Sequence, residues 1–488
     1  MSTPWSLDGF ELVCGLEVHV ELTALRTKMF SAEPIDFGGA PNTRVGPVSA
    51  GLPGSLPVVN GAAVEAAARL GLALNCDVAE RCQFHRKNYF YPDLPKNYQI
   101  SQYDVPLCHD GWLEIEVDGD DLRIGIERVH MEEDTAKSSH EGDTGRLHGA
   151  DRSLIDLNRA GIPLLECVSH PDIRRLEEAQ AYLRELVAIA RALGISNARM
   201  EEGSIRCDAN VSVRRPGEEY GTRTEIKNLN SVRSVGRAIA HEAERQVRLL
   251  QDGGNVVQET RHWDEDRGVT ETLRRKETLA DYRYFPDPDL VAIVHPAGRV
   301  EQLRASLPEL PAATRSRLVE VGVAASQAAT IVAGDLVRWF DEAASMGAAP
   351  DAIGNWLAGE VTGQLGAAGL EPADSGMTGA HVGELLGLIA DGSLSNALAK
   401  QVLEGVIEAR GAKSPAQVAQ ERGLEQVSDE GELRAIVEQV IADNSDTVES
   451  IRGGNDKAIG ALVGQVMKAT RGQADPTLTN QLLRELIG

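Results

Sequence analysis

The sequence predicts an α+β protein. A large N-terminal domain of mixed strands and helices, residues 1–300, precedes two all-α modules, residues 301–411 and 412–488. Two stretches of the N-terminal part alternate strictly between apolar and polar residues, which is typical of strands. Near residue 300 the composition shifts to Ala, Leu, Val and Glu, which favours helices. A Gly- and Pro-containing break at 411–415 divides the helical part in two.

The clearest element is a strand predicted over residues 204–214, S-I-R-C-D-A-N-V-S-V-R. One face is apolar, and the other carries Ser, Arg, Asp and Asn. Short side chains of mixed charge favour a surface that holds a charged ligand, since a merely solvated face tends to carry long Lys and Glu. Residues 222–228 can return as a second strand. One allowed register places Asp208 opposite Lys227 and Asn210 opposite Glu225, which brings opposite charges together in the first pair.

Acidic residues gather on or beside the predicted strands. In the stretch 16–22, Glu17, His19 and Glu21 share one face of a strand. Further acidic groups lie at 132–134 and 201–202. A single group of this kind would usually be surface charge. Together with the polar face of the strand at 204–214, these make four such groups in one region, which predicts a metal or metal–phosphate site.

Helices are predicted from apolar periodicity and end signals. A helix over 172–193 has Asp172 as its N-cap and Gly194 at its end. The linker at 306–311 separates the mixed region from the helices at 312–410. In the last module, a helix over 456–470 has Asn455 as its cap and Gly472 at its end. Basic residues of this module are Arg452, Lys457, Lys468 and Arg471.

Composition narrows the classes of function. The net charge of −25 argues against broad nonspecific binding to DNA or to an anionic membrane, but local basic patches can still bind a nucleic acid. Residues 223–248 hold six Lys or Arg against three Glu, either as such a patch or as a solvated helix face. Six scattered cysteines favour reduced thiols in a cytosolic protein. Neither a signal peptide nor an apolar run of membrane-spanning length is expected.

Several nucleotide and nucleophile motifs are absent from the sequence. There is no G-x-x-x-x-G-K-[ST], no G-x-G-x-x-G behind a strand and no G-x-S-x-G. Nothing is similar to the Ser-Ser-Lys site of amidases. Any nucleotide chemistry is therefore expected to use carboxylates and a metal, without a standard phosphate loop.

Four long segments, together with the residues above, closely resemble a known family. They are residues 86–104 (R-K-N-Y-F-Y-P-D-L-P-K-N-Y-Q-I-S-Q-Y-D), 156–166, 200–230 and 275–290. The family is the B subunit of aspartyl/glutamyl-tRNA(Asn/Gln) amidotransferase, and the resemblance covers nearly the whole chain. The tail resembles that of this family too, although Ala461 and Ser445 depart from its usual pattern.

The resemblance implies a cytosolic heterotrimeric ligase. An amidase-type glutaminase partner releases ammonia from glutamine, and a small third partner stabilises the complex. The B subunit uses ATP and Mg²⁺ to phosphorylate the side-chain carboxylate of Glu-tRNA(Gln) or Asp-tRNA(Asn), and ammonia then displaces the phosphate. Phosphoryl transfer needs charge neutralisation and positioning rather than a protein nucleophile. A tRNA-holding scaffold and an independent metal-dependent hydrolase are the alternative interpretations.

The resemblance also assigns candidate residues by position. The implied metal site consists of Glu17, His19, Glu132, Glu133 and Glu201. Imidazole is an unusual Mg²⁺ ligand, so three roles are open for His19: a weak direct contact with the metal, a contact through water, or a hydrogen bond to phosphate. The catalytic candidates are Glu132, Glu133, Asp208 and Glu225. The candidates for binding ATP phosphates or the tRNA 3′ end are Lys87, Lys96, Arg206, Arg223, Lys227 and Lys276.

Overall fold

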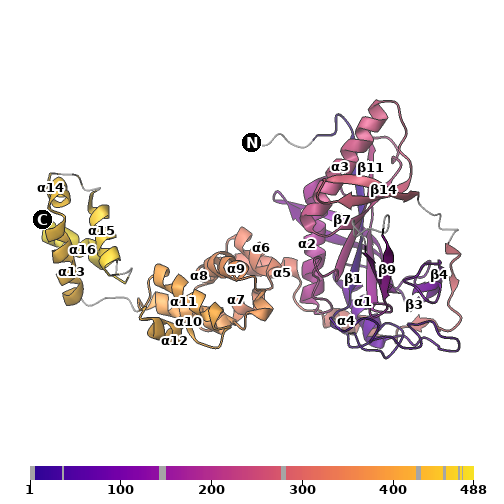
Figure 1. The fold of residues 1–488 in the computed structure, drawn as a ribbon, viewed down its shortest axis with the longest axis horizontal. Coiled ribbons are helices and arrows are strands. Elements are labelled where there is room, and N and C mark those ends of the chain that lie inside the picture. Colours follow the sequence, from indigo (N-terminus) through magenta and orange to yellow (C-terminus); the bar gives the residue numbers. More distant parts are fainter. Residues whose placement is uncertain are drawn as a thin grey trace. The chain divides into compact units, whose positions relative to one another are not determined.

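A computed structural model describes residues 6–35, 38–141, 150–275, 282–424, 430–453, 455, 458–470, 473–474 and 476–488. The chain divides into two compact units, Met1–Pro311 and Ala312–Gly488 (Figure 1). The first unit mixes strands and helices, and the second is helical among its described residues. The α+β class expected from the sequence is confirmed.

A nine-stranded sheet forms the centre of the first unit, in the order β14-β13-β12-β11-β1-β10-β7-β6-β2. Its neighbouring strands are antiparallel except β12 and β13, which run parallel. The strands are β1 (Glu11–Glu21), β2 (Asp77–Val78), β6 (Cys108–Val117), β7 (Asp120–Glu133), β10 (Pro163–Ser169), β11 (Ile205–Arg214), β12 (Thr224–Leu229), β13 (Glu259–Asp264) and β14 (Val269–Arg275).

The predicted register between β11 and β12 is present in part. Asn210 faces Glu225, as expected, but an irregularity between Cys207 and Ala209 interrupts the ladder. The ammonium of Lys227 nevertheless binds the Asp208 carboxylate. The two predicted strands and their charge pairing are therefore confirmed, with a local bulge that the alternating pattern did not indicate.

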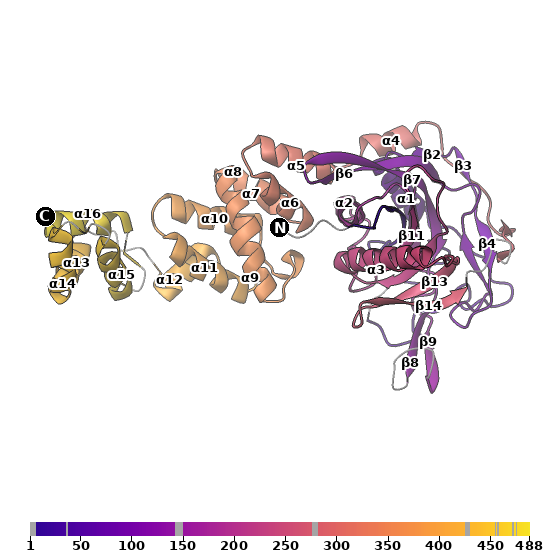
Figure 2. The same cartoon turned by 90° about the horizontal axis from the view of Figure 1, so that it is seen from above.

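Three helices pack on the sheet, α1 (Gly61–Ala73), α2 (Leu176–Ala192) and α3 (Val232–Gln251). Their apolar stripes join one hydrophobic core with the apolar faces of β1 and β11, where Leu16, Val18 and Val211 are buried. Figure 2 shows α3 running alongside strands of the sheet. Because the strands alternate, burying this face leaves their polar residues on the other one.

The start of α2 differs from the prediction. The helix begins at Leu176, and the carboxylate of Glu178 accepts hydrogen bonds from the backbone N–H groups of Arg174 and Arg175 at 2.7 and 3.1 Å. Asp172 instead accepts from the backbone N–H of Gly125 at 2.9 Å. The sequence pattern predicts Asp172 as the helix cap, but in the structure Asp172 makes a tertiary contact with β7 instead.

Smaller sheets flank the large one. One has the order β15-β4-β5, and two others pair β3 with β16 and β8 with β9. The β8–β9 hairpin projects from the rest of the unit in Figure 2. The bounds are β3 (Arg81–Cys82), β4 (His85–Asn88), β5 (Tyr98–Ser101), β8 (Lys137–Glu141), β9 (Arg152–Asp156), β15 (Phe285–Pro286) and β16 (Ile293–Val294).

The second unit contains two separate hydrophobic clusters. The first is formed with α5 (Pro311–Glu320), α6 (Ala325–Ala333), α7 (Val337–Ser345), α8 (Pro350–Asn355), a π-helical turn (Trp356–Val361), α9 (Thr362–Ala367), α10 (Gly379–Ala390), α11 (Asn396–Glu408) and α12 (Pro415–Arg422). The second lies among α13 (Glu430–Asp443), α14 (Ser445–Arg452), α15 (Ile459–Ala469) and α16 (Pro476–Ile487).

The packing shifts two expected boundaries. Helix α4 (Arg299–Ala305) packs on α1, so the first unit extends to Pro311 rather than to residue 300. Helix α12 packs with α10 and α11, so the break at 411–415 does not separate it from the first cluster. The tail helix α15 follows Ala458 as its N-cap instead of Asn455. Asp456, Lys457, Arg471 and Gly472 lie outside the described residues. Among those that are described, no helix is long and apolar enough to cross a membrane.

Candidate functional site

A row of polar residues crosses four strands in the middle of the large sheet. Arg206 on β11 lies opposite His19 on β1, and His19 lies opposite Glu166 on β10. Glu166 in turn lies opposite His130 on β7. Directly paired residues project to the same face of a sheet, so these side chains line up away from the helices.

His19 is the centre of this row. Its Nε2 lies 3.5 Å from Glu132 Oε1 and 3.3 Å from Glu166 Oε2. Burial disfavours the charged imidazolium, but the hydrogen bond to Glu166 and the charges of Glu166 and Glu132 outweigh it and raise the pKa of His19 to about 9. His130 supports the same carboxylate, with its Nε2 3.5 Å from Glu166 Oε2. The buried Glu132 also accepts from Ser101 Oγ at 3.3 Å.

Glu17 extends the acidic site toward β11, where it lies opposite Asp208. The negative charge of Glu166, followed by burial, raises the pKa of Glu17 to about 7. Within the described parts of the chain, the Glu17 carboxylate has neither a hydrogen bond nor an ion pair. Its neighbours therefore leave negative charge in excess at this position.

These residues form two groups that share His19. Ligand atoms of Glu17, His19 and Asp208 all lie within 4.8 Å of one another, and the same holds for His19, Glu132 and Glu166. Such a concentration of carboxylate oxygens suits a hard divalent cation, Mg²⁺ above all. The unpaired Glu17 is the observation that favours a cation here over a closed network of internal ion pairs.

Cationic side chains border the carboxylates on two sides. Lys227 on β12 binds Asp208 and lies 3.1 Å from Glu225 Oε1. Burial alone would lower the pKa of Lys87 on β4, but the negative charges of Glu132 and Glu166 outweigh it, raise that pKa and hold the ammonium charged. Arg206 binds Asp134 at 2.6 Å. The site thus combines oxygen ligands for a metal with ammonium and guanidinium groups suited to phosphate.

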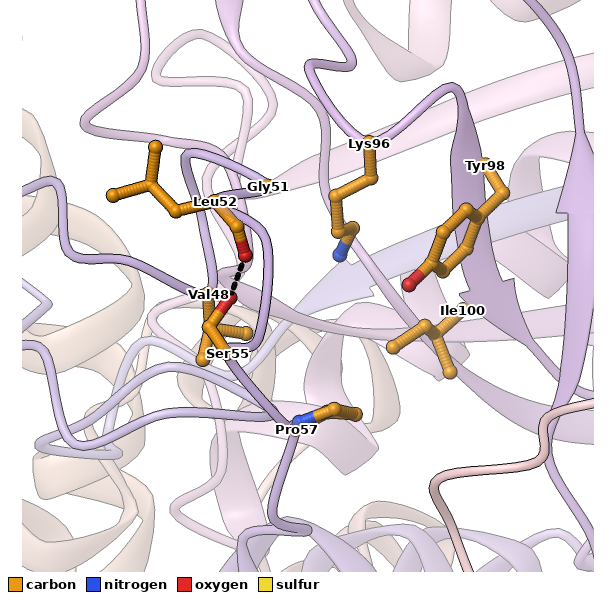
Figure 3. Close-up of a pocket in the computed structure, with 8 residues that line it drawn as sticks. All are labelled: Val48, Gly51, Leu52, Ser55, Pro57, Lys96, Tyr98 and Ile100. Atoms are coloured by element: carbon orange, nitrogen blue, oxygen red, sulfur yellow. Dashed lines mark hydrogen bonds between the residues drawn. The ribbon is translucent and has the colours of Figure 1, made fainter.

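Glu133 is not brought into either carboxylate group. Its side chain accepts from the ammonium of Lys96 and, at 2.9 Å, from the backbone N–H of Ile100. Successive residues of a strand project to opposite faces, so Glu132 and Glu133 point away from each other. Lys96 lines a small pocket together with Val48, Gly51, Leu52, Ser55, Pro57, Tyr98 and Ile100 (Figure 3).

Among the residues that the structure describes, two other sequence candidates also stand apart from the carboxylate groups. Glu201 is exposed in the turn before β11. Arg223 is exposed just before β12, and no described residue pairs with it. Lys276 lies outside the described residues. The resemblance assigned Glu201 to the metal site, but Glu201 lies in an exposed turn in the structure.

Sequence reasoning missed Glu166 and His130. Glu166 lies within P-L-L-E-C-V-S, a strand that is apolar on both sides of it, so period-two alternation gives no warning. A lone carboxylate in such a run is itself unusual, because buried acids need partners. His130 precedes Glu132 by two positions, which places both on one face of β7.

Comparison with known proteins agrees with this organisation. Residues 12–301 match the family model described as the GatB/GatE catalytic domain, and residues 338–487 match the one described as the GatB domain. The first unit thus belongs to a class of catalytic domains, and most of the second unit matches the GatB domain.

Relatives that match over nearly their whole length identify the family. The chain is 53% identical over 485 residues to the aspartyl/glutamyl-tRNA(Asn/Gln) amidotransferase B subunit of Salinispora tropica, covering 98% of this chain and 97% of the relative. It is 52% identical to that of Thermobifida fusca, covering 99% and 95%, and 50% identical to that of Carboxydothermus hydrogenoformans, covering 98% of each. The chain belongs to the family of aspartyl/glutamyl-tRNA(Asn/Gln) amidotransferase B subunits, as the sequence motifs predicted.

Proposed function

We propose that this chain is the ATP-using component of a tRNA-dependent amidotransferase, a carbon–nitrogen ligase. It activates the side-chain carboxylate of Glu-tRNA(Gln), Asp-tRNA(Asn) or both, and ammonia then replaces the activated oxygen. The observation that carries the proposal is the presence of two clusters of possible metal ligands, Glu17–His19–Asp208 and His19–Glu132–Glu166. They share His19, and Lys87 and Lys227 flank them. A carboxylate oxygen is a poor leaving group, whereas phosphate is a good one, so activation by phosphorylation precedes amidation.

Glu17, Asp208 and Glu132 would hold Mg²⁺, with His19 beside them. When bound, the ion would neutralise phosphate charge and align the transferring group. Lys87 and Lys227 enter from opposite sides of the acidic row and would contact phosphate oxygens. Glu225 keeps the Lys227 ammonium in place, and Thr260 Oγ1 donates to Glu225 at 3.0 Å. Fixed charges of this kind stabilise a phosphoryl transition state without forming a covalent intermediate.

His19 and Glu166 hold the acidic groups in register. A protonated His19 donates toward Glu132 and Glu166, which lie on different strands. It therefore links the side-chain carboxylates of β7 and β10 while offsetting one negative charge. The imidazole of His130, which is buried, contacts Glu166 from the neighbouring strand β7.

The remaining parts of the reaction belong to partners. Because the chain has no Ser-Ser-Lys amidase site, we infer an amidase-type glutaminase partner that supplies ammonia and a small third partner, in a cytoplasmic heterotrimer. The mischarged tRNA is the acceptor. A reconstituted complex given both charged tRNAs would show whether the product is Gln-tRNA, Asn-tRNA or both.

The test is a set of carboxylate-to-amide variants in the reconstituted complex. Glu132→Gln and Glu17→Gln should abolish tRNA-dependent ATP hydrolysis and weaken Mn²⁺ binding, measured by electron paramagnetic resonance as a probe of the Mg²⁺ site. Activity of the glutaminase partner should persist. Glu201→Gln, an exposed acid outside the carboxylate groups, is the matched control. If ATP turnover survives in both site variants, the chain is a tRNA-holding scaffold instead.

A further inference from the structure

Exposed aromatic residues are concentrated around the small β15-β4-β5 sheet. Aromatic residues make up only 4% of the chain. Among the described residues, five aromatic side chains are exposed, and four of them lie on or beside this sheet: Phe90, Tyr91, Tyr103 and Phe285, the fifth being Tyr220. Large apolar rings gathered on one exposed face mark a binding surface more often than isolated ones do.

Four tyrosines form a continuous row in this region, which we call the tyrosine row: Tyr103, Tyr284, Tyr282 and Tyr89. The rings of Tyr103 and Tyr284 are stacked, with centroids 4.5 Å apart and planes at 11°. Tyr282 meets Tyr284 edge-on at 6.1 Å and Tyr89 at 6.3 Å. Tyr103, at the end of the row, keeps 43% of its surface exposed. A rigid, backed ring with a free surface is a suitable stacking platform.

The tyrosine row borders the carboxylate site. Lys87 Nζ lies 5.2 Å from the centroid of the Tyr282 ring, and Lys87 interacts with Glu132 and Glu166. From the other end, Ser101 on β5 lies 3.3 Å from Glu132, and Tyr103 follows it by two residues. Two residues of extended chain span about 7 Å, so the platform is close to the acids without entering their cluster.

Given the proposed function, on which this inference rests, we propose that Tyr103, backed by Tyr284, stacks against the unpaired terminal base at the 3′ end of the aminoacyl-tRNA. The amino acid is esterified to the ribose of that nucleotide, so its side-chain carboxylate is tethered to the base through the amino-acid side chain, the ester and the ribose. A carboxylate held beside Lys87 therefore keeps the base within reach of the tyrosine row, which borders the site.

The charge of the protein favours stacking as the means of holding this nucleotide. The net charge of −25 opposes the approach of tRNA backbone phosphates, and the cations at the carboxylate cluster are assigned to the phosphates of ATP. Base–aromatic stacking needs no counter-charge and tolerates an acidic neighbourhood. Next to the platform, Lys87 interacts with Glu132 and Glu166, and Arg86, which lies over Tyr98 and Phe285, is already paired with Asp287 and Asp289.

The experiment compares two uncharged tRNAs, one complete and one lacking the terminal adenosine, for binding to the reconstituted complex. The wild-type complex should bind the complete tRNA about five- to a hundredfold more tightly, the range for one base–aromatic stack. Tyr103→Ala and Tyr103→Leu should bind both tRNAs equally, whereas Tyr103→Phe should keep the difference. Tyr220→Ala, which removes an exposed tyrosine beside Arg214, is the matched control.

Two further readouts identify the occupant. The salt dependence of tRNA binding should be unchanged in Tyr103→Ala, because stacking releases no counterions. The KM for ATP should also be unchanged. Full discrimination between the tRNAs in Tyr103→Ala would overturn the inference, as would a raised KM for ATP with discrimination intact, since the ring would then hold the adenine of ATP. A complex that forms no amidated tRNA at all would instead remove the proposed function.

Discussion

The Glu133→Gln variant tests whether Glu133 stabilises the fold or binds the metal. The Glu133 and Lys96 side chains are only 3% and 7% exposed, and Glu133 also accepts from the backbone of Ile100. Glutamine can still accept that backbone bond but leaves the Lys96 ammonium buried without its counter-charge. Breaking a buried pair in this way costs about 3–5 kcal/mol. That is a large share of the ~5–15 kcal/mol by which native proteins are stable.

The assay is urea unfolding followed by hydrogen exchange, read from peptides covering β5 and the end of β7. This readout reports the first unit separately from the helical unit. Lys96→Met should destabilise by a similar amount, because it strands the Glu133 carboxylate. The double variant Lys96→Met/Glu133→Gln should regain most of the loss, since replacing a whole buried pair is often nearly neutral. Exposed Glu201→Gln should stay within about 0.5 kcal/mol of wild type.

A particular result would refute this reasoning. If Glu133→Gln unfolds like wild type but loses Mn²⁺ binding and ATP turnover, then Glu133 belongs to the metal site. The sequence-based assignment would then be right, and the Lys96 contact would be incidental to it.

Three more predictions concern other parts of the molecule. Burial, followed by the charge of Asp134, raises the pKa of Glu21 to about 7. The folded state therefore binds a proton that the unfolded state loses, and the stability of the protein falls as the pH rises from about 4.5 to 7. In urea unfolding, Glu21→Gln should flatten this pH dependence and be roughly 2–3 kcal/mol more stable than wild type at pH 8. Leu462→Ala removes a side chain that is 1% exposed and should lower the stability of the α13–α16 cluster by about 2–5 kcal/mol, measured by hydrogen exchange, while a change at exposed Lys468 should not. Deleting the tail should weaken tRNA binding and reduce its salt dependence without affecting glutaminase activity; equal affinity and equal salt slopes would exclude the tail from tRNA recognition.

The alternation of apolar and polar residues was sufficient to predict a strand and its polar face where one face of the strand is buried and the other is polar. β11 and the second half of β1 alternate between apolar and polar residues, so Glu17, His19 and Asp208 could be placed on the polar faces from the sequence. The alternation allowed the pairing of Asn210 with Glu225 as one register among others, and the structure has that pair.

Local pattern failed where the structure depends on distant contacts. β10 is buried on both faces, so its Glu166 looked like an interruption rather than a site residue. Glu132 and Glu133 were treated as a unit because they are adjacent, although adjacency on a strand separates side chains. The predicted start of α2 was wrong because tertiary packing, which the local sequence does not show, directs Asp172 to the backbone of Gly125 instead of to the helix end.

The central position of β1 has a consequence for the synthesis of the chain. β1 is the first strand of the sheet to leave the ribosome, yet its partners are β10 and β11, and Arg214 follows Glu11 by 203 residues. At a translation rate of about 5–20 residues per second, roughly 10–40 s pass before both edges of the strand can be paired. During that interval its apolar side chains and free backbone groups are open to wrong partners. Early synthesis is therefore the stage at which β1 is most open to mispairing, and the row that contains His19 cannot assemble before Arg206 on β11 has been synthesised.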